Sequence, residues 1–241
     1  MREWVIGKND ANQRLDKFLQ KAAPRLPQSL MYKYLRLKRI KVNGKKGEIR
    51  YRLAEGDRIT LYVNDEFFEE ADPALSFLQA PARLSIVYED ENILLLDKKP
   101  GQCVHEDNEN SVDTLIHRVQ HYLYDKGEYR PEQEHSFAPA LANRIDRNTS
   151  GIVMVAKNAQ ALRILNQVIR EREVHKYYLC VAVGHLHPEH AKLTAYLKRE
   201  EGVSQVEVFS HPVPEGRTIV TEYRVFPNPV NVHVPFLSSS T

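Results

Sequence analysis

Residues 143–156 read NRIDRNTSGIVMVA, and this segment says more about fold and chemistry than any other part of the chain. It sets one carboxylate, Asp146, between two guanidinium groups, and Gly151 precedes an apolar run that predicts a fully buried strand. Neighbouring arginines favour the charged form of a carboxylate, and their planar side chains can also bind phosphate or a base edge. A structural Asp–Arg pair that closes a turn is the competing interpretation, and the segment alone leaves both open.

The composition is that of an ordinary globular protein of 241 residues with a net charge of +2. This length suits one large domain, or a small domain joined to a medium one. No run is long and apolar enough for a membrane span, and the first residues lack the apolar stretch of a signal peptide, so we expect a cytoplasmic protein without membrane contact. The two cysteines lie far apart and the ten histidines are scattered. We therefore expect buried free thiols and no metal site.

Charge is distributed unevenly along the chain. Residues 1–63 hold 16 Lys and Arg against 6 Asp and Glu, a net charge of +10, so the remaining 178 residues carry −8. An acidic, proline-containing stretch without periodicity follows and is typical of a linker. The sequence thus predicts a basic domain at residues 1–64, a linker at 65–82 and a larger domain at 83–241.

The basic domain has the periodicity of two short helices followed by a strand. Leu15, Phe18, Leu19 and Ala22 recur at helical spacing in the first helix, and Ser29 can cap a second helix whose Leu30, Tyr34 and Leu35 face inward. Residues 58–63 alternate as a half-buried strand does. The cations left on the outer faces are the predicted RNA contacts: Arg14, Lys17, Lys33, Arg36, Lys38, Arg39 and Lys41. A merely solvated helix face is the alternative, but confinement of the excess charge to one domain favours a phosphate-binding surface.

Three patterns in this domain resemble the alpha-L RNA-binding domain, which occurs in a small-subunit ribosomal protein and in many RNA-modifying enzymes. They are RLDKFL at residues 14–19, RIKVNG at 39–44 and EGDRI at 55–59. The resemblance covers roughly residues 12–63. It implies that the partner is RNA.

The larger domain alternates apolar strand-like runs with only two long helices. We expect strands at 84–88, 93–97, 151–157, 176–183, 191–197, 203–209 and 217–225, a helix opened by Ser111, and a helix at 161–174. Many strands with few helices predict an α+β fold built on a mixed, mainly antiparallel sheet with flanking helices.

Four segments in order resemble the RluA-type pseudouridine synthases. Residues 143–151 are similar to that family's HRLDRDTSG segment. The other landmarks are Tyr88-Glu89-Asp90 through Asp97-Lys98 to Gly101 and His105, then Lys176-Tyr177-Tyr178 up to Gly184, and then residues 217–225. The resemblance runs from about residue 12 to about residue 226. It implies an enzyme that isomerises uridines in structured RNA to pseudouridine, most commonly ribosomal RNA and in some members transfer RNA, without metal or cofactor.

The resemblance also implies roles for particular residues. Asp146 corresponds to the catalytic carboxylate, acting as a nucleophile or as a base. Arg144 and Arg147 flank it, and Arg144 corresponds to a side chain that takes the place of an extruded base. Tyr178 corresponds to a base-stacking tyrosine, and Lys176 is a candidate phosphate contact. A tyrosine buried in the core and a lysine that merely starts the strand are the structural alternatives.

The sequence departs from the family pattern in three places. Asn143 and Asn148 replace a His and an Asp, and a later GRTHQIR segment, whose first arginine pairs with the catalytic aspartate, does not occur. The sequence therefore suggests a catalytic domain that is incomplete at its C-terminal end. A catalytically inactive RNA-binding protein is the alternative function, and a glycoside hydrolase is a third that needs a second acid partner. We expect a monomer.

Overall fold

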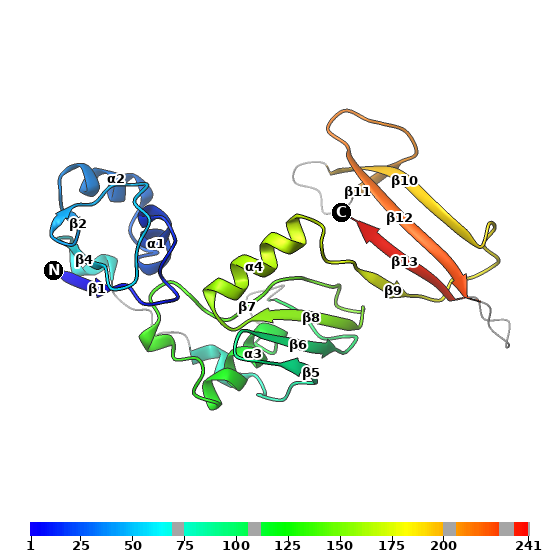
Figure 1. The fold of residues 1–241 in the computed structure, drawn as a ribbon, viewed down its shortest axis with the longest axis horizontal. Helices are drawn as coiled ribbons and strands as arrows, with labels where there is room; N and C mark the ends of the chain where they lie inside the picture. Colours follow the sequence, from blue (N-terminus) through cyan, green and yellow to red (C-terminus); the bar gives the residue numbers. More distant parts are fainter. Residues whose placement is uncertain (69–74, 106–111, 200–205, 227–233, 241) are drawn as a thin grey trace. The chain divides into compact units, whose positions relative to one another are not determined.

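The computed structural model describes residues 1–68, 75–105, 112–199, 206–226 and 234–240. The chain forms two compact units, Met1–Asn166 and Gln167–Thr241. Each unit is described by itself below. Three antiparallel sheets and four α-helices among these residues confirm the expected α+β fold (Figure 1).

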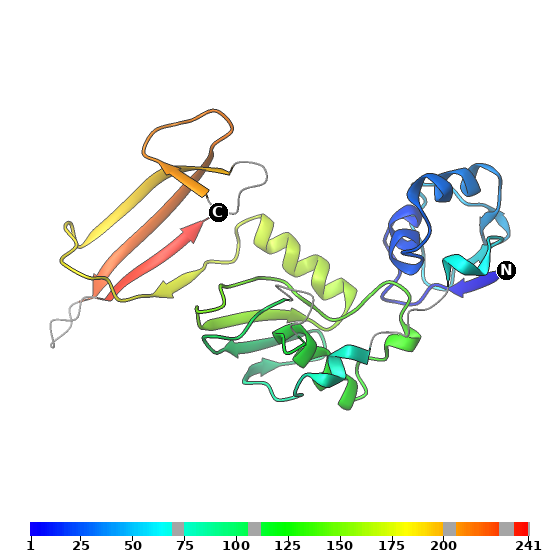
Figure 2. The same ribbon diagram turned by 180° about the vertical axis from the view of Figure 1, so that it is seen from behind.

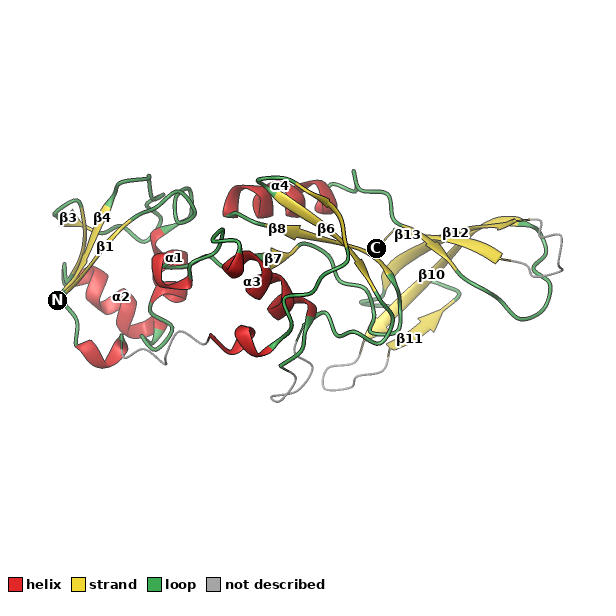
Figure 3. Ribbon diagram, turned by 90° about the horizontal axis from the view of Figure 1, so that it is seen from below, coloured by secondary structure: helices red, strands yellow, loops and turns green. Residues whose placement is uncertain are grey.

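The basic domain is a four-stranded sheet with two helices on one side (Figure 3). Its strands are β1 (Arg2–Val5), β2 (Ile40–Val42), β3 (Lys45–Lys46) and β4 (Arg58–Leu61), in the order β1-β4-β2-β3. The helices are α1 (Leu15–Ala22) and α2 (Gln28–Arg36). All pairs in this sheet are antiparallel.

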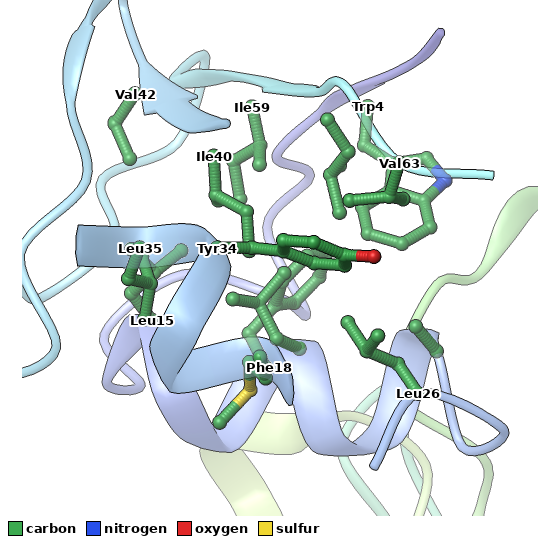
Figure 4. Close-up of a cluster of buried hydrophobic side chains, with 14 of the residues drawn as sticks. Trp4, Leu15, Phe18, Leu26, Tyr34, Leu35, Ile40, Val42, Ile59 and Val63 are labelled. Carbon is green, nitrogen blue, oxygen red and sulfur yellow. The ribbon is translucent and has the colours of Figure 1, made fainter. Parts of the chain in front are cut away.

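The helical periodicity of the basic domain predicted its core. Leu15, Phe18 and Leu19 of α1 are buried, as are Tyr34 and Leu35 of α2. Figure 4 shows the Tyr34 ring between Phe18 on one side and the strand residues Ile40 and Ile59 on the other. Burial of each large apolar side chain stabilises the fold by about 1.5–3 kcal/mol.

One detail of α2 was predicted wrongly. The helix begins at Gln28, its N-cap is Pro27, and no side chain caps it. Ser29 is exposed inside the first turn. Proline presets the backbone at a helix start, so a serine cap is not needed here.

The second sheet of the first unit contains β5 (Ile86–Glu89), β6 (Ile93–Lys98), β7 (Ala140–Leu141) and β8 (Gly151–Ala156), in the order β5-β6-β8-β7. Helix α3 (Leu115–Asp125) packs on the face that carries Leu94 and Val153 (Figures 1 and 3). The other face is more open, since Ile152 is 47% exposed. The run at 152–156 is therefore half-buried, and the expectation of a fully buried strand is wrong.

Helix α3 begins later than predicted. Ser111, the expected cap, lies outside the described residues, and Thr114 is the N-cap instead. The Thr114 hydroxyl accepts a hydrogen bond from the backbone N–H of His117 at 3.3 Å. A threonine at this position satisfies one of the free N–H groups of the first helical turn.

The expected linker contributes to both neighbouring cores. It contains the short 3-10 helices η1 (Asp65–Phe67) and η2 (Leu75–Gln79), and a third, η3 (Pro131–Gln133), precedes β7. Phe68 packs in the core of the basic domain, whereas Phe77 packs against α3 and the second sheet. Residues 69–74 lie outside the described part of the chain.

The second unit is a five-stranded antiparallel sheet, seen from two sides in Figures 1 and 2. Its strands are β9 (Tyr177–Leu179), β10 (His190–Arg199), β11 (Val206–Phe209), β12 (Arg217–Phe226) and β13 (Val234–Ser240), in the order β11-β10-β12-β13-β9. Helix α4 (Ala159–Arg170) precedes β9 in the chain. It ends at Arg170, four residues before the predicted end at residue 174. Arg172, just beyond the helix, adopts a positive φ of 61°.

Two features of this sheet differ from the prediction. The strand expected at 176–183 is limited to Tyr177–Leu179, because only these residues pair with β13. Strand β13 itself was not predicted. It pairs with β12 over seven positions, from Val220↔Ser240 to Phe226↔Val234.

Candidate functional site

Asp146 lies in an exposed loop between β7 and β8. Its side chain is exposed, as are those of Arg144 and Arg147. The backbone N–H of Thr149 donates to the carbonyl oxygen of Asp146 at 3.0 Å, which closes a turn. The chain then enters β8 through Gly151, whose φ of 136° favours glycine. The loop thus presents a carboxylate to solvent.

Asn143 fixes the start of this loop to β8. Its side-chain nitrogen donates to the carbonyl oxygen of Ile152 at 3.2 Å, and its side-chain oxygen accepts from the N–H of Met154 at 2.7 Å. The side-chain amide of Asn143 therefore forms hydrogen bonds to β8 beyond the last backbone pair between β7 and β8. This substitution relative to the family pattern is compatible with an ordered loop.

Lys98 holds the middle of the loop through its ammonium group. This lysine at the end of β6 is 1% exposed, and its ammonium donates to the carbonyl oxygens of Arg147, Lys99 and Gln102 at 2.9, 3.1 and 3.1 Å. Burial lowers the pKa of Lys98, while the charges of Cys103 and Asp146 act in the opposite direction. The Asp146 carboxylate is thus electrostatically coupled to a buried cation.

Reciprocal contacts join Arg147 to the turn after β6. The N–H of Gly101 donates to the Arg147 carbonyl oxygen at 2.8 Å, and Arg147 Nε donates to the Gly101 carbonyl oxygen at 3.1 Å. Within the described residues, no ion pair joins Asp146 to Arg144 or Arg147. The direct Asp–Arg pairing suggested by the sequence is therefore not formed.

Sequence reasoning noted Lys98 only as a family landmark and gave it no role. A signal existed: a lysine at an inward position of an alternating strand must satisfy its charge inside the protein. Leu94, Leu96 and Lys98 share the buried face of β6. The alternation of this strand therefore pointed to burial of Lys98.

Lys176 and Tyr178 belong to the second unit. Both side chains are half-buried, whereas the intervening Tyr177 is 61% exposed. Alternation along β9 places Tyr178 on the opposite face from Tyr177. Neither residue lines the one cavity described in this unit, which measures about 430 Å³ and is lined by His175, Tyr177, His190, Glu222, Tyr223, Arg224 and Phe226.

That cavity contains a carboxylate surrounded by basic groups. A hydrogen bond of 2.8 Å joins His190 Nε2 and Glu222 Oε1. The hydrogen bond with His190 lowers the pKa of Glu222, and Lys192 and Arg224 contribute in the same direction. Sequence reasoning did not single out these residues.

The predicted RNA-binding cations of the basic domain differ in the partners that they already have inside that domain. Arg14 makes a two-point contact with the buried carboxylate of Asp16, through Nε at 2.9 Å and Nη2 at 2.7 Å. It thus has a structural partner inside its own domain. Lys17 donates to Gln20 at 3.2 Å on the exposed side of α1.

The remaining predicted cations form one surface at the end of α2 and on β2, which we call the α2–β2 surface. Lys33, Arg36, Lys38 and Arg39 are exposed and Lys41 is half-buried. Arg39 lies over the Tyr34 ring at 5.6 Å and Lys41 over the Tyr62 ring at 5.1 Å. Sequence reasoning missed Lys45 and Lys46 of β3, although the pairing of Lys41 with Lys46 places them beside this surface.

The described residues contain no group of three or more metal-ligating side chains, and no helix among them has the length and apolar character needed to cross a membrane. Cys103 and Cys180 are half-buried, so the expectation that both are buried is not met.

The chain is similar to proteins of one family. Residues 92–237 match the family described as RNA pseudouridylate synthase. An uncharacterized RNA pseudouridine synthase of Mycoplasma genitalium is 33% identical over 222 residues, which cover 91% of this chain and 67% of that protein. The ribosomal large subunit pseudouridine synthase C of Vibrio cholerae is 33% identical over 227 residues, 91% of this chain and 66% of that protein. The chain thus spans about two thirds of the length of these relatives.

A solved structure supports the same fold. The human RNA pseudouridylate synthase domain containing 4 protein superposes with a TM-score of 0.50 over 65% of this chain and 59% of its own, at 16% sequence identity.

Proposed function

The chain belongs to the RNA pseudouridylate synthase family, and we propose that it converts uridines of structured RNA to pseudouridine, with Asp146 as the catalytic residue. The observation that carries this proposal is the position of Asp146, exposed on a loop that Asn143 and Lys98 hold in place. An exposed carboxylate on an ordered loop can approach a nucleotide without first rearranging.

The reaction requires little from the protein beyond this group. The N1–C1′ bond of uridine breaks, the uracil rotates, and a C5–C1′ bond forms. The C5 hydrogen leaves as a proton and N1 gains one, so there is no net oxidation or reduction. Asp146 can act as a nucleophile that adds to the nucleotide, or as a base that removes a sugar proton. Both routes remain open.

In this proposal Lys98 positions the Asp146 loop and is electrostatically coupled to the Asp146 carboxylate. Its ammonium is desolvated, so its field acts through a medium of low polarity and is less screened than that of an exposed lysine. Because it already donates to three carbonyl oxygens, it is a positioning residue and does not contact the substrate.

Roles are also proposed for the other predicted residues, each considered within its own unit. The exposed Arg144 can occupy the space of an extruded base, and Tyr178 can stack on the rotating uracil. Lys176 is proposed as a phosphate contact, and Arg147 contributes mainly through its contacts with the Gly101 turn.

RNA is the proposed partner, and ribosomal RNA the proposed class. One of the relatives is named for the large ribosomal subunit. The basic domain at residues 1–64 supplies the α2–β2 surface, whose cations can neutralise phosphates with little sequence discrimination. We propose that the protein acts as a monomer in the cytoplasm and needs no metal or cofactor.

A catalytically inactive RNA-binding protein is the second candidate. It is favoured by the absence, within the described residues, of an arginine paired with Asp146. This candidate predicts RNA binding without isomerisation.

The test compares the parent chain with Asp146→Asn on RNA labelled with tritium at C5 of uridine. Because the C5 hydrogen is lost in the reaction, tritium release to water measures turnover directly. We expect release by the parent and a fall of at least about 10³-fold in the variant, with RNA affinity in a gel-shift assay unchanged.

The matched control is Glu91→Gln, the same change from carboxylate to amide at an exposed turn between β5 and β6. Its tritium release should equal that of the parent. Equal release by Asp146→Asn and the parent excludes the catalytic role of Asp146, and binding without release by the parent selects the second candidate.

A further inference from the structure

The basic domain is hydrogen-bonded to a segment that precedes the Asp146 loop. Gln13 Nε2 donates to Ser136 Oγ at 2.7 Å, and Ser136 Oγ donates to Asp10 Oδ1 at 2.5 Å. Asn9 Nδ2 donates to Glu134 Oε1 at 2.7 Å. We call this set of contacts between residues 9–13 and 134–136 the inter-domain contact.

A ring contact accompanies these hydrogen bonds. The imidazole of His135 lies 6.0 Å from the Trp4 ring and 6.4 Å from the Phe18 ring, measured between centroids. Trp4 and Phe18 are themselves in edge-to-face contact at 5.5 Å and belong to the core of the basic domain. His135 therefore extends this aromatic cluster from another part of the chain.

The same residues also contact the start of α4. Asn9 Oδ1 accepts from the N–H of Ala159, the first residue of that helix, at 3.1 Å. Arg163 Nη1 donates to the carbonyl oxygen of Ala11 at 3.3 Å. The amide of Asn9 thus joins the basic domain to two separate segments of the chain.

The contact is partly buried. Asp10 is 2% exposed and Ala11 6% exposed, although both lie in the loop between β1 and α1. Burial raises the pKa of Glu134, and the charge of Asp10 adds to this effect. Polar contacts between domains commonly permit relative motion, but here three hydrogen bonds and the ring contact of His135 must break together before the domains can separate.

We propose that the inter-domain contact makes Asn9, Asp10, Gln13 and Ser136 positioning residues, which hold the RNA-binding surface at a fixed place relative to Asp146. Residues 134–139 continue directly into β7 and then into the Asp146 loop. RNA bound to the basic domain is thereby presented to the loop in a restricted set of orientations, whereas a domain held only by its linker would present it in many. The proposal rests on the proposed function.

The test uses the full chain with Asn9→Ala and Ser136→Ala combined. Hydrogen–deuterium exchange followed by mass spectrometry should show faster exchange, by at least about tenfold, in residues 9–18 and 134–139. RNA affinity should remain within about twofold of the parent. Tritium release at saturating RNA should fall on the order of tenfold, because binding survives while orientation is lost.

The controls separate positioning from general destabilisation. Gln133→Ala changes an exposed amide beside the contact and should match the parent in all three measurements. If the double variant does not fold, Ser136→Ala is compared with Ser136→Thr, which keeps the hydroxyl and should restore both slow exchange and tritium release.

If hydrogen–deuterium exchange in the folded double variant equals that of the parent, the inter-domain contact is excluded, whatever the change in tritium release. Faster exchange with an unchanged saturating rate overturns the positioning role. A parent chain that releases no tritium overturns the proposed function, and the positioning role with it, while the exchange measurement still decides whether the contact exists.

Discussion

At the scale of single residues, Lys98 determines how the Asp146 loop is held. Its buried ammonium binds carbonyl oxygens on both sides of the turn after β6 and on the loop itself. The sequence correctly predicted the strand that follows Gly151. It singled out Arg144 and Arg147 as the cations around Asp146 because they are adjacent in sequence, whereas Lys98 reaches the loop only when β6 and β8 pair.

Lys98→Met should destabilise the protein by about 2–4 kcal/mol. The substitution keeps an apolar stem of similar length but removes the ammonium donor from three carbonyl oxygens, of which, within the described part of the chain, only that of Arg147 keeps a second donor, the Gly101 N–H. Lys99→Met is the matched control, since that side chain is 67% exposed and its ion pair with Asp97 lies at the surface; the change expected there is below about 0.5 kcal/mol. Urea denaturation measures both. Equal midpoints for the two variants would contradict the assigned role of Lys98.

At the scale of secondary-structure elements, one carboxylate joins strand β5 to helix α3 and to the end of β8, two strands away in the same sheet. Glu89 of β5 accepts from Lys126 at 2.7 Å, from Tyr122 of α3 at 2.7 Å and from Lys157, just after β8, at 3.0 Å. Burial opposes ionisation of Glu89, but these hydrogen bonds lower its pKa to about 2. The elements were predicted from periodicity; their connection through Glu89 was not.

The lowered pKa predicts a specific loss of stability in acid. An unfolded glutamate has a pKa of 4.5, so the contribution of Glu89 is complete above that pH and is lost as pH falls toward 2. The loss amounts to about 3 kcal/mol. Glu89→Gln should be less stable than the parent at pH 7, and this difference should shrink as pH falls from 4.5 to 2. Chemical denaturation across this range measures it, and a difference independent of pH would contradict the prediction.

At the scale of the whole molecule, the two compact units differ in how completely they bury apolar side chains. Val181 and Val183, which follow the short edge strand β9, are 70% and 106% exposed. Exposed apolar residues beside a sheet edge favour association with other chains. A protein that is monomeric at low concentration is therefore expected to self-associate through this end of the second unit as its concentration rises.

The substitutions Val181→Lys and Val183→Lys together should reduce self-association. Light scattering at increasing protein concentration should show a smaller rise in mean mass than for the parent, while the melting temperature stays within about 2 °C because neither side chain is buried. Lys192→Gln, an exposed charge change on β10, serves as the control and should scatter like the parent. If the parent remains monomeric at all concentrations, the prediction fails.

The sequence by itself determined the α+β class, the basic first quarter of the chain, most strand positions and the glycine turn after Asp146, because periodicity, charge and turn residues act over a few neighbouring positions. Only the tertiary structure decided the burial of Lys98, the two-point contact of Arg14 with Asp16, the pairing of β13 and the inter-domain contact. Most of these depend on segments far apart in the chain, and whether a polar side chain meets a partner there is set by how the elements pack rather than by any local pattern.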